Sequence, residues 1–424
     1  MSATDPHHVL HRTIEAVWRI ESARVIAGLT RFTRDVGLAE DLAQEALLAA
    51  LEKWPQSGVP ENPGAWLTAT AKRRAIDLFR RNAVAERKHR ELARDLATLE
   101  QAVPDLNSNL DDPIGDDLLR LVFISCHPIL STESRAALTL RLLGGLTTPE
   151  IARAFLTPEP TIAQRIVRAK RILAEKHILF EVPRGSELAS RLASVLEVIY
   201  LIFNEGYSAT AGDDLIRPTL CEDALRLGRT LAELTPIEPE VHGLVALMEI
   251  QVSRTRARIT STGEPVLLFD QNRTQWDLLL IHRGLTAIDR AHKIDRPRGP
   301  YLLQAEIAAC HAQARTNEET DWPRIVSLYT ELAHLTPSPV VELNRAVAVS
   351  MVHGPQAALD LVEALAADPS LDRYHLLPSV RADLLLKLNR PTEARRHFEQ
   401  AAALTQNTRE RALLLTRAAA CQTR

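Results

Sequence analysis

Apolar residues recur every three or four positions along most of this chain, which is the period of an α-helix. One such stripe, in the segment before residue 174, consists of Ile162, Ile166, Ala169 and Leu173. Segments in which Val, Ile or Thr alternate with polar residues, as in a strand, are scarce. The hydrophobic pattern therefore predicts an all-α protein.

Residues 147–173 predict two short helices joined by a tight turn. Thr147 can cap the first helix, with Glu150 at the third helical position as in a capping box. We expect this helix to end near Phe155, and Thr157 to cap the next one with Pro158 at its first position. The face opposite the apolar stripe carries Thr161, Gln164, Arg165, Arg168 and Arg171. This pattern is typical of a helix-turn-helix that binds DNA, although an ordinary amphipathic surface helix has it too.

The C-terminal part of the chain carries a weak internal repeat. Residues 354–368 and 390–404 align with an offset of 36 positions, and Pro337 and Pro369 lie 32 positions apart. Helix pairs that recur at about 34 residues are typical of tetratricopeptide-like repeats, in which small alanines allow close packing. The Trp-x-x-Leu-Gly signature of those repeats is absent. The pattern predicts an α-solenoid over residues 186–424, with an irregular helical bundle as the alternative.

Charge is unevenly distributed along a chain whose formal net charge is -3. Residues 72–90 hold eight Lys or Arg against two acids, within a predicted helix over 65–90. Residues 91–117 hold eight acids and one Arg, which predicts a flexible linker. A basic helix in a nearly neutral protein indicates a polyanionic partner, DNA or RNA first. A solvated helix face is the commoner reason for a run of charge.

A second charged face lies in the predicted helix over residues 39–54. Its inward positions are Ala43, Leu47, Ala50, Leu51 and Trp54, and its outward positions are Asp41, Gln44, Glu45 and Glu52. Because an acidic face repels phosphate, it favours a protein partner with a basic surface, unless it is a merely solvated face.

Composition argues against several other classes of function. The 424 residues suffice for about two to four domains. Four widely spaced cysteines without a CxxC pair argue against a disulfide framework or a zinc site, and they fit a reducing cytoplasm. The sequence shows neither a signal-peptide pattern nor the apolar run of about 20 residues that a membrane helix needs. It also lacks GxSxG, HExxH and P-loop motifs, so we expect no enzyme activity, no cofactor and no metal site.

The acidic helix, the basic helix and the helix-turn-helix, in that order, resemble the extracytoplasmic-function (ECF) class of bacterial sigma-70 factors. Residues 39–54 are similar to region 2.2, which in the family docks on the coiled coil of the RNA polymerase β′ subunit. Residues 65–81 are similar to regions 2.3 and 2.4, which bind, melt and read the −10 promoter element. Residues 130–173 are similar to region 4, which reads the −35 element. The resemblance spans about residues 10–180.

The resemblance implies roles for individual residues. Core polymerase binding is expected from Asp41, Gln44 and Glu45, and matches in regions 2.3 and 2.4 are Trp66, Ala71, Asp77, Arg80 and Arg81. Contacts to the −10 element are expected from Trp66, Lys72, Arg73, Arg74, Arg80 and Arg81, with Arg73 standing where the family often has Asn. Contacts to the −35 element are expected from Thr161, Gln164, Arg165, Arg168 and Arg171. The turn at 156–158 departs from the usual Gly-Ile-Ser form.

Residues 186–424 resemble the helical, tetratricopeptide-like extension of one ECF subgroup, with 200–210 and 267–277 similar to its characteristic segments. Polar and aromatic residues in these two segments are candidates for a contact with the sigma domains or a ligand, or for a satisfied turn between helices. They are Asn204, Glu205, Tyr207, Asp270, Gln271, Arg273, Trp276 and Asp277.

The expected organisation has four parts: sigma region 2 at 8–90, an acidic linker at 91–117, sigma region 4 at 118–180 and the extension at 186–424. We expect a cytoplasmic sigma factor whose partners are the β′ and β subunits of core polymerase and promoter DNA. Its extension is expected to regulate it in cis, through contact with the sigma domains, or to bind a partner. The alternative is a helix-turn-helix regulator fused to a repeat scaffold, acting without core polymerase.

Overall fold

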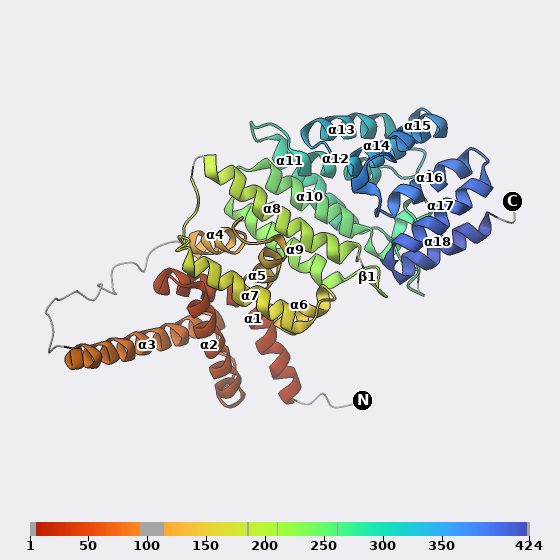
Figure 1. The fold of residues 1–424 in the computed structure, drawn as a ribbon. Helices are drawn as coiled ribbons and strands as arrows, with labels where there is room; N and C mark the ends of the chain where they lie inside the picture. Colours follow the sequence, from red (N-terminus) through yellow and green to blue (C-terminus); the bar gives the residue numbers. More distant parts are fainter. Residues whose placement is uncertain (1–5, 94–113, 185, 210, 261, 422–424) are drawn as a thin grey trace. The chain divides into compact units, whose positions relative to one another are not determined.

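The computed structural model describes residues 6–93, 114–184, 186–209, 211–260 and 262–421. Their internal contacts define two compact units. The first unit comprises residues 1–153 and 157–198, and the second comprises residues 154–156 and 199–424. Both are built from helices, and the described residues contain two strands of two residues each (Figure 1). The prediction of an all-α protein is confirmed. Among the described residues, no helix is long and apolar enough to cross a bilayer.

The described residues of the first unit form seven helices and the beginning of an eighth. They are α1 (Pro6–Thr33), α2 (Val36–Ser57), α3 (Pro63–Ala93), α4 (Ile114–Ser125), α5 (Thr132–Leu142), α6 (Thr148–Ala154), α7 (Glu159–Glu175) and α8 (Ser186–Tyr207). Helices α1, α2 and α3 pack against one another, and α4 and α5 contact α1. Most of the predicted acidic linker lies outside the described residues, between the end of α3 and the start of α4.

Local sequence explains how α2 begins and ends. Arg34 has a φ of 57°, and the Asp35 side chain accepts a hydrogen bond from the Leu38 N–H at 3.0 Å, so the carboxylate caps the helix. At the other end, Gly58 has a φ of 80° and its N–H donates to the Trp54 carbonyl. Glycine reaches that left-handed conformation without steric cost. The chain then turns through the Pro/Gly-rich segment into α3.

From Arg191 onward, helix α8 packs into the core of the first unit. The Arg191 guanidinium donates to the Phe123 carbonyl at 2.9 Å, and the Ser194 hydroxyl donates to the Cys126 carbonyl at 2.7 Å. Phe123, Cys126 and Ser194 are buried. The first turns of α8 therefore satisfy the carbonyls at the end of α4, which would otherwise lack partners in the interior.

In the second unit, the part of the chain that the structure describes forms the end of α8 and ten further helices. They are α9 (Pro218–Leu234), α10 (Pro239–Ser253), α11 (Leu278–His292), α12 (Pro300–Gln313), α13 (Trp322–Leu335), α14 (Pro339–Val352), α15 (Pro355–Leu365), α16 (Leu376–Lys387), α17 (Pro391–Leu404) and α18 (Thr408–Ala420). Short 3₁₀ helices lie at Thr255–Ala257 (η1), Leu268–Asp270 (η2), Arg273–Gln275 (η3) and Pro369–Leu371 (η4). Proline is the first residue of many of these helices, where its missing N–H costs nothing.

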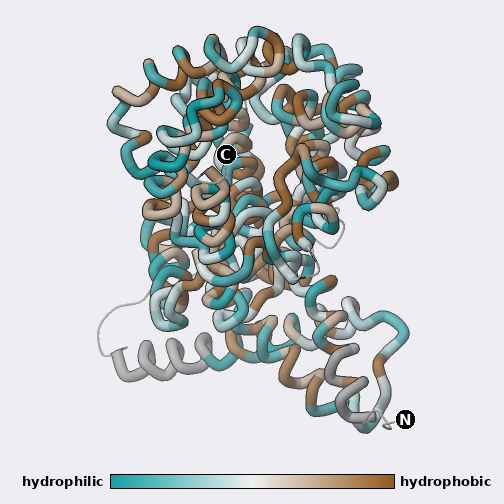
Figure 2. The backbone as a smooth tube through the Cα atoms, turned by 90° about the vertical axis from the view of Figure 1, so that its right-hand side faces the viewer, coloured by the Kyte–Doolittle hydropathy of each residue, from teal (hydrophilic) through white to brown (hydrophobic). Residues whose placement is uncertain are grey.

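Each helix of the second unit packs on the next, from α9 to α18, and α10 also packs on α12 (Figure 1). This is the solenoid arrangement that the internal repeat predicts. Small residues permit the close packing: a Cβ on Gly243 would lie 2.6 Å from the backbone nitrogen of Leu302 on α12. Apolar and polar positions interleave along most of these helices, as Figure 2 shows, so most of them bury one face between their neighbours. Helix α10 is the exception, since almost all of its residues are buried.

The two ends of the second unit are joined by a short parallel strand pair, β1 (Ala211–Gly212) with β2 (Gln406–Asn407). Asn407 is fully buried, and its side-chain amide both donates and accepts hydrogen bonds. Its amide nitrogen donates to the carbonyls of Ala209 and Asp214 at 3.1 and 3.0 Å. Its amide oxygen caps α18 by accepting from the N–H groups of Arg409 and Glu410. One side chain thus ties the start of the solenoid to its last helix.

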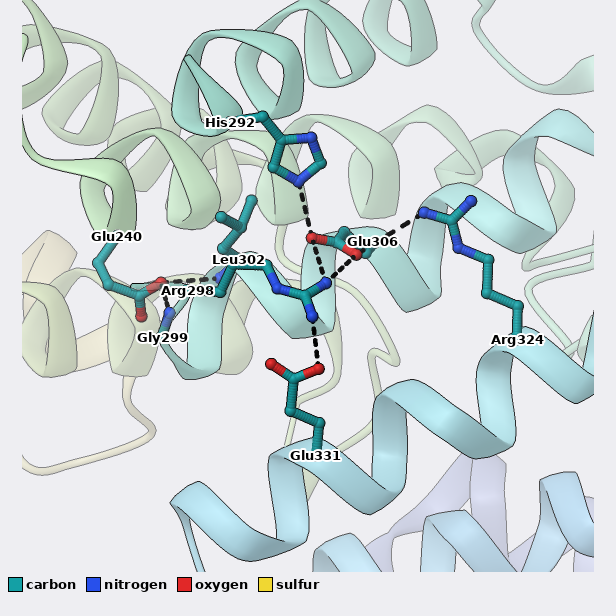
Figure 3. Close-up of polar contacts among 8 residues, drawn as sticks. All are labelled: Glu240, His292, Arg298, Gly299, Leu302, Glu306, Arg324 and Glu331. Atoms are coloured by element: carbon teal, nitrogen blue, oxygen red, sulfur yellow. Dashed lines mark hydrogen bonds and ion pairs between the residues drawn. The ribbon is translucent and has the colours of Figure 1, made fainter. Parts of the chain in front are cut away.

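Two carboxylates fix the passage from α11 to α12 (Figure 3). Glu306, 2% exposed, is 2.9 Å from the His292 Nε2 and 3.1 Å from the Arg298 guanidinium. Glu240 accepts hydrogen bonds from the backbone N–H groups of Gly299, Tyr301 and Leu302 at 2.8–3.1 Å. Burial raises the pKa of Glu240, and the three N–H groups oppose that rise. Charge placed at the N-terminus of α12 in this way offsets the helix dipole.

Candidate functional site

The basic residues of α3 lie on its solvent face. Arg73, Arg80 and Arg81 are exposed, and Lys72 is half-buried. Ala71 and Ala75 are fully buried on the opposite side of the helix, which packs on α1 and α2. This exposed face of α3 therefore presents three guanidinium groups to solvent. The side chains of residues 82–90, which include the other basic residues of this predicted helix, lie outside the described part of the chain.

Trp66 and Arg74 differ from those three arginines because both contact α2. The Trp66 ring is half-buried and meets the Trp54 ring edge-on, with centroids 5.4 Å apart. The Arg74 guanidinium lies 2.7 Å from the Glu45 carboxylate. Of the six residues expected at the −10 element, these two are held by the helix that carries the acidic face.

The acidic face of α2 is accessible. Asp41 is exposed, with 75% of its side chain accessible, and Glu45 is exposed despite its ion pair. Gln44 is half-buried on the same face. The inward positions expected from the sequence are buried or half-buried, Trp54 among the most completely. Solvent-accessible carboxylates on a helix whose other side is packed are available to a basic partner.

Glu40, next to this face, is a residue that sequence reasoning missed. Its side chain is 3% exposed, and its carboxylate lies 2.5 Å from both the Arg141 Nε of α5 and the Lys170 Nζ of α7. Lys170 also lies 4.0 Å from Asp41. Within the first unit, α2 is thus held to α5 and α7 by one buried carboxylate between two cations. Its partners are 101 and 130 positions away, so no local pattern identifies it.

Helices α6 and α7 form a helix-turn-helix. The capping box is confirmed: the Thr147 N–H and hydroxyl donate to Glu150 at 2.7 and 2.8 Å, and the Glu150 N–H donates back at 3.4 Å. The stripe of Ile162, Ile166, Ala169 and Leu173 is buried. On the opposite face Gln164, Arg168 and Arg171 are exposed, while Thr161 and Arg165 are half-buried. The face of α7 turned to solvent is therefore cationic and rich in hydrogen-bond donors.

The expected start of α7 is wrong. The N-cap is Pro158 and no side chain caps the helix, which begins at Glu159. Thr157 instead belongs to the end of α6, because its N–H donates to the Ala152 carbonyl at 3.0 Å. Leu156, in the turn, has a φ of 47° where the usual glycine would be free of strain. The likeness of the segment to a helix-turn-helix survives, but with a different cap.

Known proteins match both units of this chain. Family models for sigma-70 region 2 and sigma-70 region 4 match residues 19–84 and 120–173, and a family of unknown function, DUF6596, matches residues 191–292. The uncharacterized protein R00370 of Rhizobium meliloti is 44% identical over 396 residues, 92% of each chain. The ECF RNA polymerase sigma factor SigK of Mycobacterium ulcerans is 31% identical over 153 residues, which are 35% of this chain and 76% of that one.

This chain belongs to the ECF sigma factors. It has the two sigma-70 regions and continues into the long C-terminal extension that marks one subgroup. The probable ECF sigma factor SigI of Mycobacterium tuberculosis is 27% identical over 172 residues, 40% of this chain and 57% of that one. The crystal structure of yeast Tom70 aligns with 92% of this chain and 81% of its own at a TM-score of 0.31 and 13% identity. The solenoid arrangement rests on the helix contacts above.

In the extension of this sigma factor, most of the polar residues in the segment 267–277 hold the segment itself in place. Arg273 donates to the carbonyls of His311 and Ala314 at 2.6 and 2.7 Å, and Asp277 caps α11. Trp276 is buried and the Gln271 amide donates to the Val266 carbonyl, whereas Asp270 is exposed. These contacts match a satisfied turn, which is one of the two interpretations that the sequence leaves open. Trp276 and Asp277 also line a surface pocket of about 500 Å³, so the segment is accessible to a ligand as well.

The candidate residues of the segment 200–209 are also held by contacts within the second unit. Glu205 forms an ion pair with Arg217, and Asn204 bonds to Tyr200. The Tyr207 ring stacks on Phe203 with centroids 5.6 Å apart, and the Arg258 guanidinium lies over the Tyr207 ring, 3.7 Å from its centroid. A cation over an aromatic face is attracted to the ring and shielded from water.

Proposed function

We propose that this ECF sigma factor binds core RNA polymerase through its β′ and β subunits and directs promoter recognition and melting. It has no catalytic chemistry of its own. The proposal rests most directly on one observation: the first unit presents an accessible acidic face on α2, an exposed basic face on α3 and an exposed cationic face on α7. In domain terms, region 2 corresponds to residues 8–90, region 4 to residues 118–180 and the extension to residues 186–424.

The −10 surface divides into two groups of residues. Arg73, Arg80 and Arg81 are exposed and can bind the phosphates and bases of an opened strand, where cationic side chains provide salt-dependent affinity. Lys72 supports them from the edge of the face. Trp66 and Arg74 position α3 against α2, and Arg74 reaches DNA only by leaving Glu45.

The core-binding surface comprises Asp41, Gln44 and Glu45 on α2. Asp41 is its most accessible carboxylate. The −35 surface comprises Thr161, Gln164, Arg165, Arg168 and Arg171 on α7. Three of these side chains, Gln164, Arg168 and Arg171, are exposed and can donate hydrogen bonds to base edges and phosphates. The half-buried side chains of Thr161 and Arg165 lie beside them.

The extension regulates the factor in cis, through contact with the sigma domains, or binds a partner. Its test is a shortened chain that ends after residue 209 and keeps α8 whole, because Arg191 and Ser194 belong to the core of the first unit. Transcription from a cognate promoter is compared between this chain and the full one. Equal transcription and equal stability would contradict regulation in cis.

The experiment that tests the sigma assignment is a mobility shift of promoter DNA with core polymerase, with this chain, and with both. Promoter-specific binding that requires both proteins is expected. Tight, specific binding of duplex DNA by the chain alone would favour a regulator that acts without polymerase.

A further inference from the structure

A cavity of about 350 Å³ lies in the second unit and has no part in the proposed function. Its walls come from α14, α16 and α18, from Leu267 and from Phe269 in η2. Most of the lining is apolar and consists of Leu267, Phe269, Val347, Met351, Val380 and Leu384. Its volume lies at the lower end of the range of about 300–1,000 Å³ that is typical of small-molecule sites.

Several of the apolar side chains at this cavity are accessible although burial would be favourable. Leu267, Phe269 and Met351 are 39%, 41% and 38% exposed. Accessible apolar residues that gather at one cavity, rather than lying singly over a surface, indicate a binding site. Methionine in such a wall adapts its shape to a ligand.

The segment that carries Phe269 is held in place before any ligand arrives. The Phe269 ring stacks on Trp322 with centroids 5.9 Å apart, and its carbonyl accepts a hydrogen bond from the Asn317 amide at 2.7 Å. Arg273 also donates to the Asn317 side chain at 2.8 Å. The polar residues of this segment thus fix a rigid aromatic wall, which lowers the entropy that ligand binding would cost.

The charged groups of the lining leave one positive charge in excess. Arg417 pairs with Asp383 and also lies over the Phe398 ring at 4.4 Å, so these two charges compensate each other. Lys387 is exposed and forms no ion pair with a described residue, and its ammonium group lies 3.7 Å from the Met351 sulfur. An ammonium group beside an apolar cavity is complementary to a ligand with an anionic head and an apolar body.

We propose that this cavity binds a small amphipathic organic anion, with its apolar body between Phe269, Met351 and Leu384 and its anionic head at Lys387. The site goes beyond the proposed function and is independent of it, since binding is measured on the chain without polymerase or DNA. The extension would then carry a ligand site that selects for the size of the ligand's apolar body and for one negative charge on its head.

The test uses the full chain and the fluorescent anion 1-anilinonaphthalene-8-sulfonate as the probe. Decanoate and decanol, which share a chain and differ in the charge of the head, compete with it. The variants are Lys387→Glu, which reverses the charge, and Met351→Trp, which fills the cavity. Lys293→Glu changes the net charge equally at an exposed lysine outside the lining and is the matched control. Circular dichroism and thermal melting verify that each variant is folded.

We expect one saturable probe site that decanoate occupies about tenfold more tightly than decanol, because a charge-assisted contact contributes roughly this factor. Lys387→Glu removes the preference for decanoate and Met351→Trp weakens both competitors, while Lys293→Glu changes neither. Three results would overturn the proposal: no saturable site, equal binding of the two competitors by the unmodified chain, or a preference that survives in Lys387→Glu. Lys387 is exposed, so that variant is expected to fold and the test stays decisive if Met351→Trp does not.

Discussion

Arg74 on α3 and Glu45 on α2 form an ion pair, with the guanidinium nitrogen and the carboxylate oxygen 2.7 Å apart. The pair links the helix proposed to contact the −10 element with the helix proposed to bind core polymerase. Any change at either residue therefore acts on both helices, because it leaves the other charge without its partner. Asp41, four positions before Glu45, is not coupled to α3 in this way.

Asp41→Ala is expected to weaken core polymerase binding about tenfold, because it removes an accessible carboxylate from the docking face. At saturating core polymerase its promoter opening should be normal. Glu45→Ala should impair both binding and opening, since it also releases Arg74. The double variant Glu45→Arg, Arg74→Glu retains an ion pair between α2 and α3 with the charges exchanged. It therefore separates the role of the pair in holding the two helices together from the role of the Glu45 carboxylate in binding core polymerase. Affinity for core polymerase is measured by titration, with Glu15→Ala, at an exposed position of α1 outside the acidic face, as the control. Unchanged affinity in Asp41→Ala would refute the assignment of this face.

Charge reversal at Arg80 and Arg81 is expected to weaken promoter opening more than core binding. Both side chains are exposed on α3 and contact no described residue of α2 by an ion pair. Each lost phosphate contact to a single strand should lower the salt slope of binding by about 0.7. Permanganate footprinting measures opening and a pull-down measures core binding, with Arg24→Glu on α1 as the control. Equal losses in both assays would contradict the placement of these residues at the −10 element.

Asn407→Asp is expected to destabilise the second unit by about 2 kcal/mol or more. The carboxylate would still cap α18, but it would replace an amide donor that faces the carbonyls of Ala209 and Asp214. Burying an acceptor against acceptors leaves all of them unsatisfied. Urea unfolding of the full chain measures the effect, with exposed Asn344→Asp as the matched control. Equal stability of the two variants would show that the joint at β1 and β2 contributes nothing.

His311 is expected to make the second unit less stable in acid. Burial, followed by the charges of Arg254 and Arg273, lowers the pKa of this side chain to about 4 from an ordinary value near 6.5. Between those two pH values His311 binds a proton in the unfolded chain but not in the folded chain. The contribution of neutral His311 to the free energy of unfolding is therefore complete above pH 6.5. It is lost as the pH falls toward 4, by up to about 1.4 kcal/mol per pH unit.

The His311→Gln variant should lose less thermal stability than the unmodified chain when the pH is lowered from 7 to 5. His334→Gln, at an exposed position of α13, should leave that loss unchanged. Parallel curves for His311→Gln and the unmodified chain would mean that His311 does not govern this pH response.

The sequence was informative wherever a contact is local. The capping box of Thr147 and Glu150 and the buried stripe of α7 follow from spacings of three and four residues, so both could be predicted. The start of α7 could not be predicted, because Thr157 has two possible local contacts. Its hydroxyl could cap α7, or its N–H could donate to the Ala152 carbonyl of α6. The backbone bond to Ala152 prevailed.

Long-range contacts lay beyond the reach of sequence patterns. Glu40 looks like one more acid beside an acidic face, and its burial depends on Arg141 and Lys170 from distant helices. Asn407 resembles an ordinary cap, and its second role depends on carbonyls almost 200 positions earlier. The sequence pattern makes the polar residues of 267–277 candidate ligand contacts, and of these Trp276 and Asp277 line a pocket of about 500 Å³. The cavity proposed to bind an organic anion is lined instead by their apolar neighbours Leu267 and Phe269.

The most direct test of the central claim is in vitro transcription of a sheared genomic library with core polymerase and this chain, read out by sequencing RNA 5′ ends. We expect discrete start sites that share two upstream elements, that are absent with core polymerase alone and that disappear with the Arg80→Glu, Arg81→Glu double variant. The same start sites with and without the chain would contradict its function as a sigma factor.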